Sequence, residues 1–114
     1  MVATHPHTYT DWLREHPWAQ ILDPRSSANL EWRWERSRNL AEFGVTGCGL
    51  DTAGNREFQV NSESDSNRHY HVTLERGCDC PDGRLAGRAS LGWCKHRFAA
   101  WTWWTNFTAE SKGG

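Results

Sequence analysis

Three cysteines and one histidine in two tight pairs constrain this chain more than any other feature. Cys78 and Cys80 form a C-D-C pair, thirteen residues follow, and Cys94 and His96 form a C-K-H pair. Residues at i and i+2 of an extended segment point to the same side, so each pair can direct two donors at one point. Three thiols and one imidazole are a donor set that Zn²⁺ binds as a tetrahedron, at about 2.3 Å to sulfur and about 2.0 Å to nitrogen. The spacing therefore predicts one structural zinc ion held by these four residues.

Two disulfides are the alternative for four cysteines, but a bridge between Cys78 and Cys80 would be strained. The first ten residues lack the basic and apolar runs of a secretory signal, and no apolar run reaches the length of a membrane span. We therefore expect an intracellular protein, cytoplasmic or nuclear if the host is eukaryotic, with no membrane partner. Reduced thiols in such a compartment favour a metal. Cys48, which lies between Gly47 and Gly49, is expected to be a buried, inert thiol.

The charge is unevenly distributed along the 114 residues, although the formal net charge is only −1. Residues 1–75 contain seven arginines against eleven acidic residues, whereas residues 76–97 contain five basic residues against two acidic ones. The segment with the predicted zinc ligands is thus the basic one. Its cations either neutralise the net negative charge of a zinc ion with three thiolates or bind an anionic partner, and both interpretations stay open.

The pattern of apolar residues predicts an α+β fold in which two helices pack on a short antiparallel sheet of about three strands. Residues 1–25 are expected to form an arm with one helical turn near Thr10 or Asp11, ended by Pro17. Residues 26–43 are expected to be a helix capped by Ser26 or Ser27. A second helix is expected to open at the Cys94–His96 pair and to run through about Phe107.

The strands are predicted from strict alternation of apolar and polar residues between turn signals. They cover residues 45–50, 56–62 and 68–75, and the last two form a hairpin with His69 and His71 facing outward. The side chains expected to face the core are Phe58, Val60, Tyr70, Val72 and Leu74. The expected organisation is an arm over 1–25, a domain over 26–108 with its zinc unit over 56–108, and a tail over 109–114.

Eight tryptophans are more than one small core usually needs. They either pad the core or supply aromatic surface for a partner. On the C-terminal helix, Trp103 shares the side of His96 and is expected to be buried against the sheet, while Trp101 lies opposite and needs cover from the N-terminal segment or a partner. The candidates for a partner interface are Trp12, Trp18, Trp101 and Trp104.

The stretch from about Arg56 to Trp101 resembles a SWIM-type zinc finger. The resemblance rests on C-D-C-P-D at 78–82, C-K-H at 94–96, the preceding hairpin, and the small residue Ala99 three positions after the histidine. It implies a ββα-like zinc unit with the four ligands already named. SWIM units occur in MuDR-like transposases and recombination mediators, and they bind DNA or protein rather than catalyse reactions. This chain has no transposase, helicase or kinase region beside the unit.

We therefore expect a non-enzymatic zinc module that binds nucleic acid, with DNA as the expected ligand, as an accessory part of a larger complex. Four protein ligands leave no open position on the metal for water, and no small-molecule substrate is expected. The alternative is a protein–protein adaptor that uses the tryptophan-rich helix and arm. The candidates for nucleic-acid contacts are Arg76, Arg84, Arg88, Trp93, Lys95 and Arg97.

Overall fold

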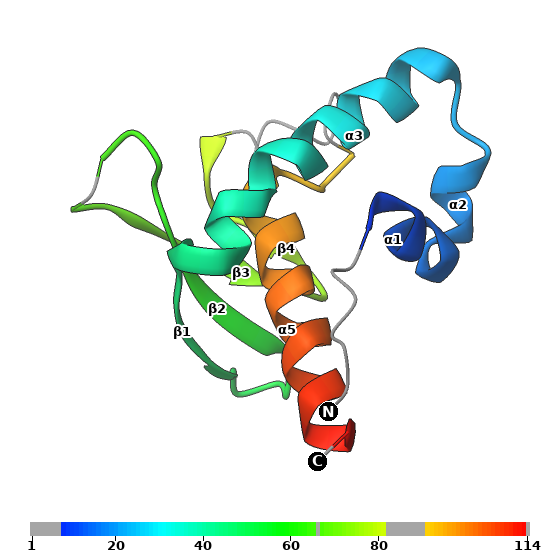
Figure 1. The fold of residues 1–114 in the computed structure, drawn as a ribbon. Coiled ribbons are helices and arrows are strands. Elements are labelled where there is room, and N and C mark those ends of the chain that lie inside the picture. Colours follow the sequence, from blue (N-terminus) through cyan, green and yellow to red (C-terminus); the bar gives the residue numbers. More distant parts are fainter. Residues whose placement is uncertain (1–7, 66, 82–90, 114) are drawn as a thin grey trace.

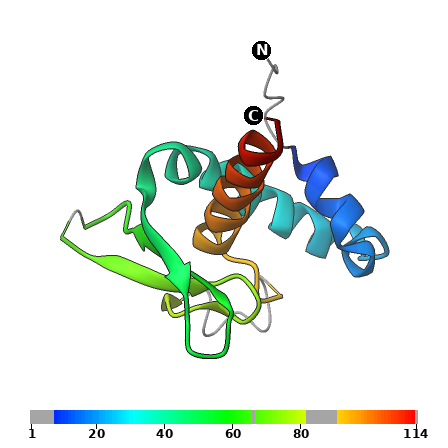
Figure 2. The ribbon, with the colours of Figure 1, turned by 90° about the horizontal axis from the view of Figure 1, so that it is seen from below.

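The computed structural model describes the backbone of residues 8–65, 67–81 and 91–113, and the side chains of these residues up to Phe107. It has the predicted α+β architecture. A four-stranded antiparallel sheet packs on the C-terminal helix α5 (Lys95–Gly113), and α5 lies between the sheet and helix α3 (Pro24–Asn39) (Figures 1 and 2). Within the described residues, no helix is both long and apolar enough to cross a membrane.

The N-terminal segment forms two short helices, α1 (Tyr9–Glu15) and α2 (Pro17–Gln20). The cap of α1 is Thr8 rather than Thr10 or Asp11. Thr8 Oγ1 accepts a hydrogen bond from Asp11 N at 3.2 Å, and the Asp11 carboxylate accepts one from Thr8 N at 2.9 Å. This reciprocal capping box fixes the helix that carries Trp12, whose side chain has no solvent exposure. The segment therefore packs into the core instead of lying only on the surface.

Helix α3 starts earlier than predicted. Asp23 is its N-cap and accepts a hydrogen bond from Ser26 N at 3.2 Å, while Pro24 occupies the first helical position, where a missing N–H costs nothing. The prediction of Ser26 or Ser27 as the cap was wrong because this Asp-Pro signal precedes them. Leu30 and Trp34, four positions apart on one face of this helix, are buried. The helix continues into one π-helical turn, η1 (Leu40–Gly44).

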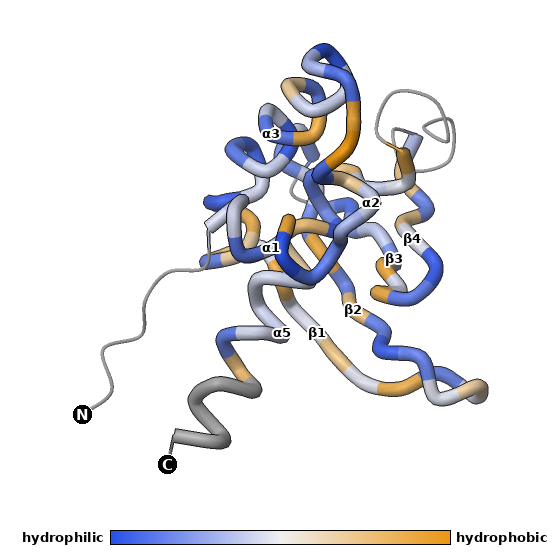
Figure 3. Tube along the Cα trace, turned by 90° about the vertical axis from the view of Figure 1, so that its right-hand side faces the viewer, coloured by the Kyte–Doolittle hydropathy of each residue, from blue (hydrophilic) through white to orange (hydrophobic). Residues whose placement is uncertain are grey.

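In their order across the sheet, the strands are β1 (Val45–Leu50), β2 (Arg56–Asn61), β3 (His69–Thr73) and β4 (Gly77–Cys78), so the sheet has one short strand more than predicted. The alternation of apolar and polar residues along the strands is visible in Figure 3. In the register, Phe58 pairs with Val72 and with Cys48. The predicted core face is confirmed: Phe58, Val60, Val72 and Leu74 are buried and Tyr70 is half-buried, whereas His69 and His71 are exposed.

Helix α5 continues past the predicted end at Phe107 and through most of the predicted tail. The predicted side of Trp103 is confirmed, because its ring lies 5.8 Å from the ring of Phe58 on the sheet, but the side chain is half-buried rather than buried. Trp101, on the other side, is only 5% exposed and its ring lies 5.9 Å from that of Trp34. The cover over Trp101 is therefore helix α3.

Candidate metal centre

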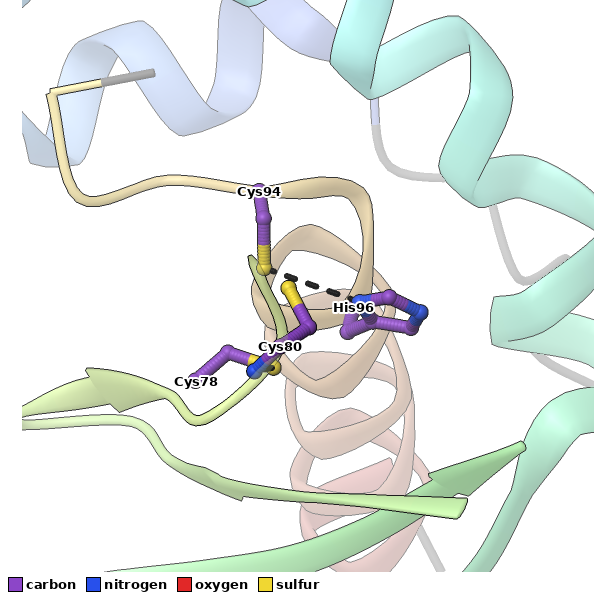
Figure 4. Close-up of side chains that lie close together, drawn as sticks. All are labelled: Cys78, Cys80, Cys94 and His96. Atoms are coloured by element: carbon purple, nitrogen blue, oxygen red, sulfur yellow. Dashed lines mark hydrogen bonds between the residues drawn. The ribbon is translucent and has the colours of Figure 1, made fainter. Parts of the chain in front are cut away.

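The four predicted ligands converge in the structure (Figure 4). Their candidate donor atoms, the three thiol sulfurs and one imidazole nitrogen, all lie within 4.8 Å of one another. The side chains are buried, with exposed fractions of 8% for Cys78, 2% for Cys80, 0% for Cys94 and 5% for His96. Two segments fourteen residues apart along the chain therefore meet at one closed point.

The C-D-C pair is held in place by the residue between its two cysteines. Asp79 N donates to His71 O at 3.1 Å, and His71 N donates to Asp79 Oδ1 at 3.0 Å, so this aspartate continues the pairing of β4 with β3. The thiols on either side of Asp79 then both turn toward the core. Gly77 enters this segment with a φ of +129°, a conformation that L side chains rarely adopt.

The C-K-H pair is held by the start of α5. Phe98 N donates to Cys94 O at 3.1 Å, so Cys94 immediately precedes the helix and His96 lies in its first turn. Nδ1 is the imidazole nitrogen that faces the site, 3.8 Å from Cys94 Sγ. The ring of Tyr70, on β3, lies 4.7 Å from the His96 ring and closes that side of the site.

Arg97 ties together the elements around the site. Its guanidinium donates to Leu74 O, at 3.2 Å from Nε and 2.6 Å from Nη2, and to Gly92 O at 2.9 Å from Nη1. It also lies 4.1 Å from the centroid of the Trp93 ring. These contacts join the end of β3, the segment before Cys94 and helix α5. Burial lowers the pKa of this guanidinium below its ordinary value, and the negative charges of Cys94, Glu75 and Cys78 offset only part of that effect.

The electrostatics of the cluster disfavour thiolates that lack a compensating cation. Hydrogen bonds with Cys80 and Cys94, together with burial, raise the pKa of the Cys78 thiol. The hydrogen bond with Cys78 lowers the pKa of Cys94, but hydrogen bonding with Cys80 and burial raise it more, to about 12. A bound divalent cation would reverse this balance, because metal-coordinated thiols are deprotonated.

The donor set and its dimensions fit a tetrahedral metal ion. Metal–ligand distances of about 2.0–2.3 Å imply ligand atoms roughly 3.5–3.8 Å apart. The Cys94 Sγ to His96 Nδ1 distance is 3.8 Å, and the others are no longer than 4.8 Å. The cluster is thus compatible with a metal site in which all four protein ligands are buried.

Three of the predicted nucleic-acid contacts are engaged within the molecule. Trp93 is only 5% exposed, with its ring 5.1 Å from that of Trp12, so it is not presented to a base. Arg97 is committed to backbone carbonyls as described. Lys95 donates from Nζ to Glu63 Oε1 at 2.7 Å. The sequence places these residues in a basic segment, but it does not show that the fold turns them inward or pairs them.

The other three have different outcomes. Arg76 is exposed and remains a candidate for a surface contact. Arg84 and Arg88 lie outside the described residues.

The tryptophans proposed for a partner interface divide into two pairs. Trp12 and Trp101 belong to the core, with exposed fractions of 0% and 5%, so they are not available to a partner in this conformation. Trp18 is 41% exposed, and Trp104 is half-buried with the Arg56 guanidinium 5.2 Å from its ring centroid. The first pair is buried because helices α1 and α3 cover α5.

A surface cluster that the sequence interpretation did not assign lies on α3. Trp32 is 56% exposed, and the guanidinium of Arg36 lies 4.9 Å from its ring centroid. Arg36 Nη2 also lies 3.8 Å from Glu63 Oε1, the same oxygen that accepts from Lys95 Nζ. We call Trp32, Arg36, Glu63 and Lys95 the α3 cluster. The available signal was the helical phase of Trp32, which places it well away from the buried positions Leu30 and Trp34.

Cys48 is exposed, so the expectation of a buried thiol was wrong. β1 is an edge strand, and the position of a strand within its sheet cannot be seen from alternation alone. Cys48 pairs with Phe58, so its side chain lies on the opposite face of the sheet from His71. His71 Nδ1 lies 3.2 Å from Glu57 Oε1. The exposed thiol and this imidazole–carboxylate pair therefore point to opposite faces of the sheet, although their residues line the same shallow depression.

Comparisons with family models, with curated proteins and with solved structures give no match for this chain. The chemical interpretation of the site therefore depends on its own residues and geometry.

Proposed function

We propose that the Cys₃His cluster holds one structural zinc ion and that the chain is a SWIM-type, non-enzymatic module that binds single-stranded nucleic acid, DNA in the first instance. Zinc matches three thiolates and one imidazole better than the hard cations, which prefer oxygen ligands. When bound, the ion supplies a fixed cross-link between the β3–β4 edge and the start of α5. The residues around it only hold and orient the ligands.

The observation that carries the nucleic-acid proposal is the α3 cluster. Helix α3 contains four arginines against two glutamates, and the segment with the metal ligands is also basic. Glu63 receives Arg36 from the first segment and Lys95 from the second, so the two basic segments meet beside the exposed Trp32. An accessible indole flanked by cations is the combination that binds unpaired bases by stacking and the backbone by charge.

The test measures binding of a fluorescently labelled oligonucleotide without secondary structure, by anisotropy across a salt series. Trp32→Ala is expected to weaken binding by roughly tenfold or more, since a base stack contributes about 1–3 kcal/mol. Arg36→Ala is expected to weaken binding and to flatten the logarithmic salt dependence by about 0.7 if one phosphate contact is lost. Glu63→Gln is expected to strengthen binding, because it releases both cations from their carboxylate.

The matched control is Arg14→Ala, which removes the same charge from a side chain that is 74% exposed on helix α1. It should leave the salt dependence unchanged. Equal binding by wild-type protein and Trp32→Ala, or weaker binding by Glu63→Gln, would contradict the assignment of this surface. Elemental analysis that gives no zinc, or a different metal at one per chain, would contradict the assignment of the metal independently.

A protein-interaction role is the second candidate, favoured by the large apolar side chains on the surface. Ile21 is 86% and Phe43 is 77% exposed. If the chain binds no oligonucleotide even at low salt, and a host protein binds the wild type but not Phe43→Ser, the adaptor role replaces the first proposal.

A further inference from the structure

The strand β1 forms an edge of the sheet, and no described strand pairs with its outer side. Its six residues contain neither a charged residue nor proline, two of the devices that keep edge strands from pairing, and its register irregularity lies between Val45 and Gly47, away from the hairpin end. Asp51 N donates to Asn55 O at 2.9 Å at the hairpin end. The alternation of antiparallel pairing then directs the backbone groups of Gly49 toward β2, and those of Cys48 and Leu50 toward the open side. This edge therefore offers hydrogen-bond donors and acceptors to another strand.

Apolar side chains extend the core toward the same edge. Leu50 is 70% exposed and Phe107 is 47% exposed. The Phe107 ring stacks on Trp103 at 5.2 Å between centroids, and Trp103 contacts Phe58, the register partner of Cys48. A strand added to β1 would place every second side chain beside this aromatic layer of α5. The edge thus combines unpaired backbone groups with apolar area to bury.

We propose that β1 pairs antiparallel with β1 of a second copy of this chain, about a two-fold axis at Cys48. In this register Cys48 lies opposite Cys48 of the partner subunit, and Gly47 lies opposite Gly49 of the partner subunit. No like charges face each other across the seam. Gly47 and Gly49 have no side chain on the face of the sheet opposite to Cys48, and a Cβ atom placed at Gly49 would meet nothing within 4 Å.

A second copy fits this edge better than a foreign strand because the edge is complementary to itself. A two-fold axis at Cys48 pairs the backbone N–H of each Cys48 with the backbone carbonyl of Cys48 of the partner subunit. Such isologous dimers are the commonest closed assemblies. It also brings both copies of α5 to one side of a continuous sheet, so the two aromatic layers meet. This dimer does not depend on nucleic-acid binding, because the α3 cluster lies elsewhere.

The test is the mass of the full chain with excess zinc, measured by analytical ultracentrifugation across the widest soluble concentration range. The wild type and Cys48→Ser should both show the doubled mass as concentration rises. Cys48→Lys should halve the mass by placing two ammonium groups opposite each other, with unchanged circular dichroism and zinc content. If Cys48→Lys does not fold, Leu50→Lys is the second variant. It replaces a largely exposed apolar side chain of β1 with a charged one and should also lower the mass to that of the monomer.

Cross-linking gives the position of the seam. A short bis-maleimide should join two wild-type chains through Cys48, identified by peptide mapping, and should not join Cys48→Ser chains. A wild-type chain that stays monomeric overturns the proposal and leaves the edge to a strand of another protein. A dimer that survives both lysine variants, or a dimer without the Cys48 cross-link, overturns it as well.

Discussion

Arg97 is not a metal ligand, yet replacing it by Gln is expected to cost about 2–4 kcal/mol of the free energy of unfolding with zinc bound. Its guanidinium donates to two backbone carbonyls, those of Leu74 and Gly92, and stacks on Trp93. Hydrogen bonds from a charged donor contribute about 1.5–3 kcal/mol each, and a partly desolvated cation–π contact adds about 1–2 kcal/mol. Two effects reduce this sum: ordering the Arg97 side chain costs about 2 kcal/mol, and Gln could retain one of the hydrogen bonds.

The assay is urea unfolding followed by circular dichroism at one fixed excess of zinc, because the zinc concentration itself shifts the apparent stability. Arg76→Gln is the matched control, since Arg76 is exposed on the neighbouring turn and its loss should change stability by no more than about 0.5 kcal/mol. Arg97→Lys should fall between the two, because it keeps the charge but loses the planar fork that reaches both carbonyls. Equal stability of Arg97→Gln and Arg76→Gln would refute the reasoning that this side chain holds the metal-binding segments together.

Three further outcomes follow from the structure. Chelation of the metal, or Cys94→Ser, should unfold at least the region of the sheet edge and α5, since structural zinc contributes roughly 10–16 kcal/mol in small finger peptides; near-native circular dichroism after chelation would argue against this. Trp101→Ala should cost about 3–5 kcal/mol of stability and Trp103→Ala less, because the first side chain is buried under α3 and the second is half-buried. A lower unfolding temperature for Trp103→Ala than for Trp101→Ala would contradict this packing. Burial raises the pKa of Glu75, but hydrogen bonds from Arg56 lower it more, so the pKa of this carboxyl is lower in the folded state than in the unfolded state. Glu75→Gln should therefore cost up to about 1 kcal/mol of stability at neutral pH. This difference from wild type should shrink as the pH falls through the folded-state pKa, because the wild-type carboxylate is then protonated.

The sequence alone predicts the features that depend on local spacing. The C-D-C and C-K-H pairs specify the ligand cluster because donors at i and i+2 need only a strand or a helix start to converge. The strands are predictable because each buried position, such as Phe58 or Val72, is followed by a polar one. The phase of α5 follows from the 3.6-residue period, which separates Trp101 from Trp103.

The features that escaped prediction depend on contacts between distant segments. Lys95 is paired with Glu63, thirty-two residues earlier, and no local charge count shows this. Trp93 and Trp32 carry the same indole and are equal candidates for stacking when only the sequence is considered. The fold buries Trp93 against Trp12 and exposes Trp32. The exposure of Cys48 follows from the order of the strands, which alternation does not encode.

The two edges of the sheet differ in length and in exposure. At one edge, β4 has only two residues and leads directly into the C-D-C pair, so that edge is short and is closed by the ligand cluster. At the other edge, β1 has six uncharged residues and an exposed apolar flank. The four candidate ligands are buried and cannot themselves contact a partner, so both proposed recognition surfaces, the α3 cluster and the β1 edge, use other residues. Under both proposals, the zinc ion acts on binding indirectly, by fixing the helix start that brings Lys95 to Glu63 and the sheet that presents β1.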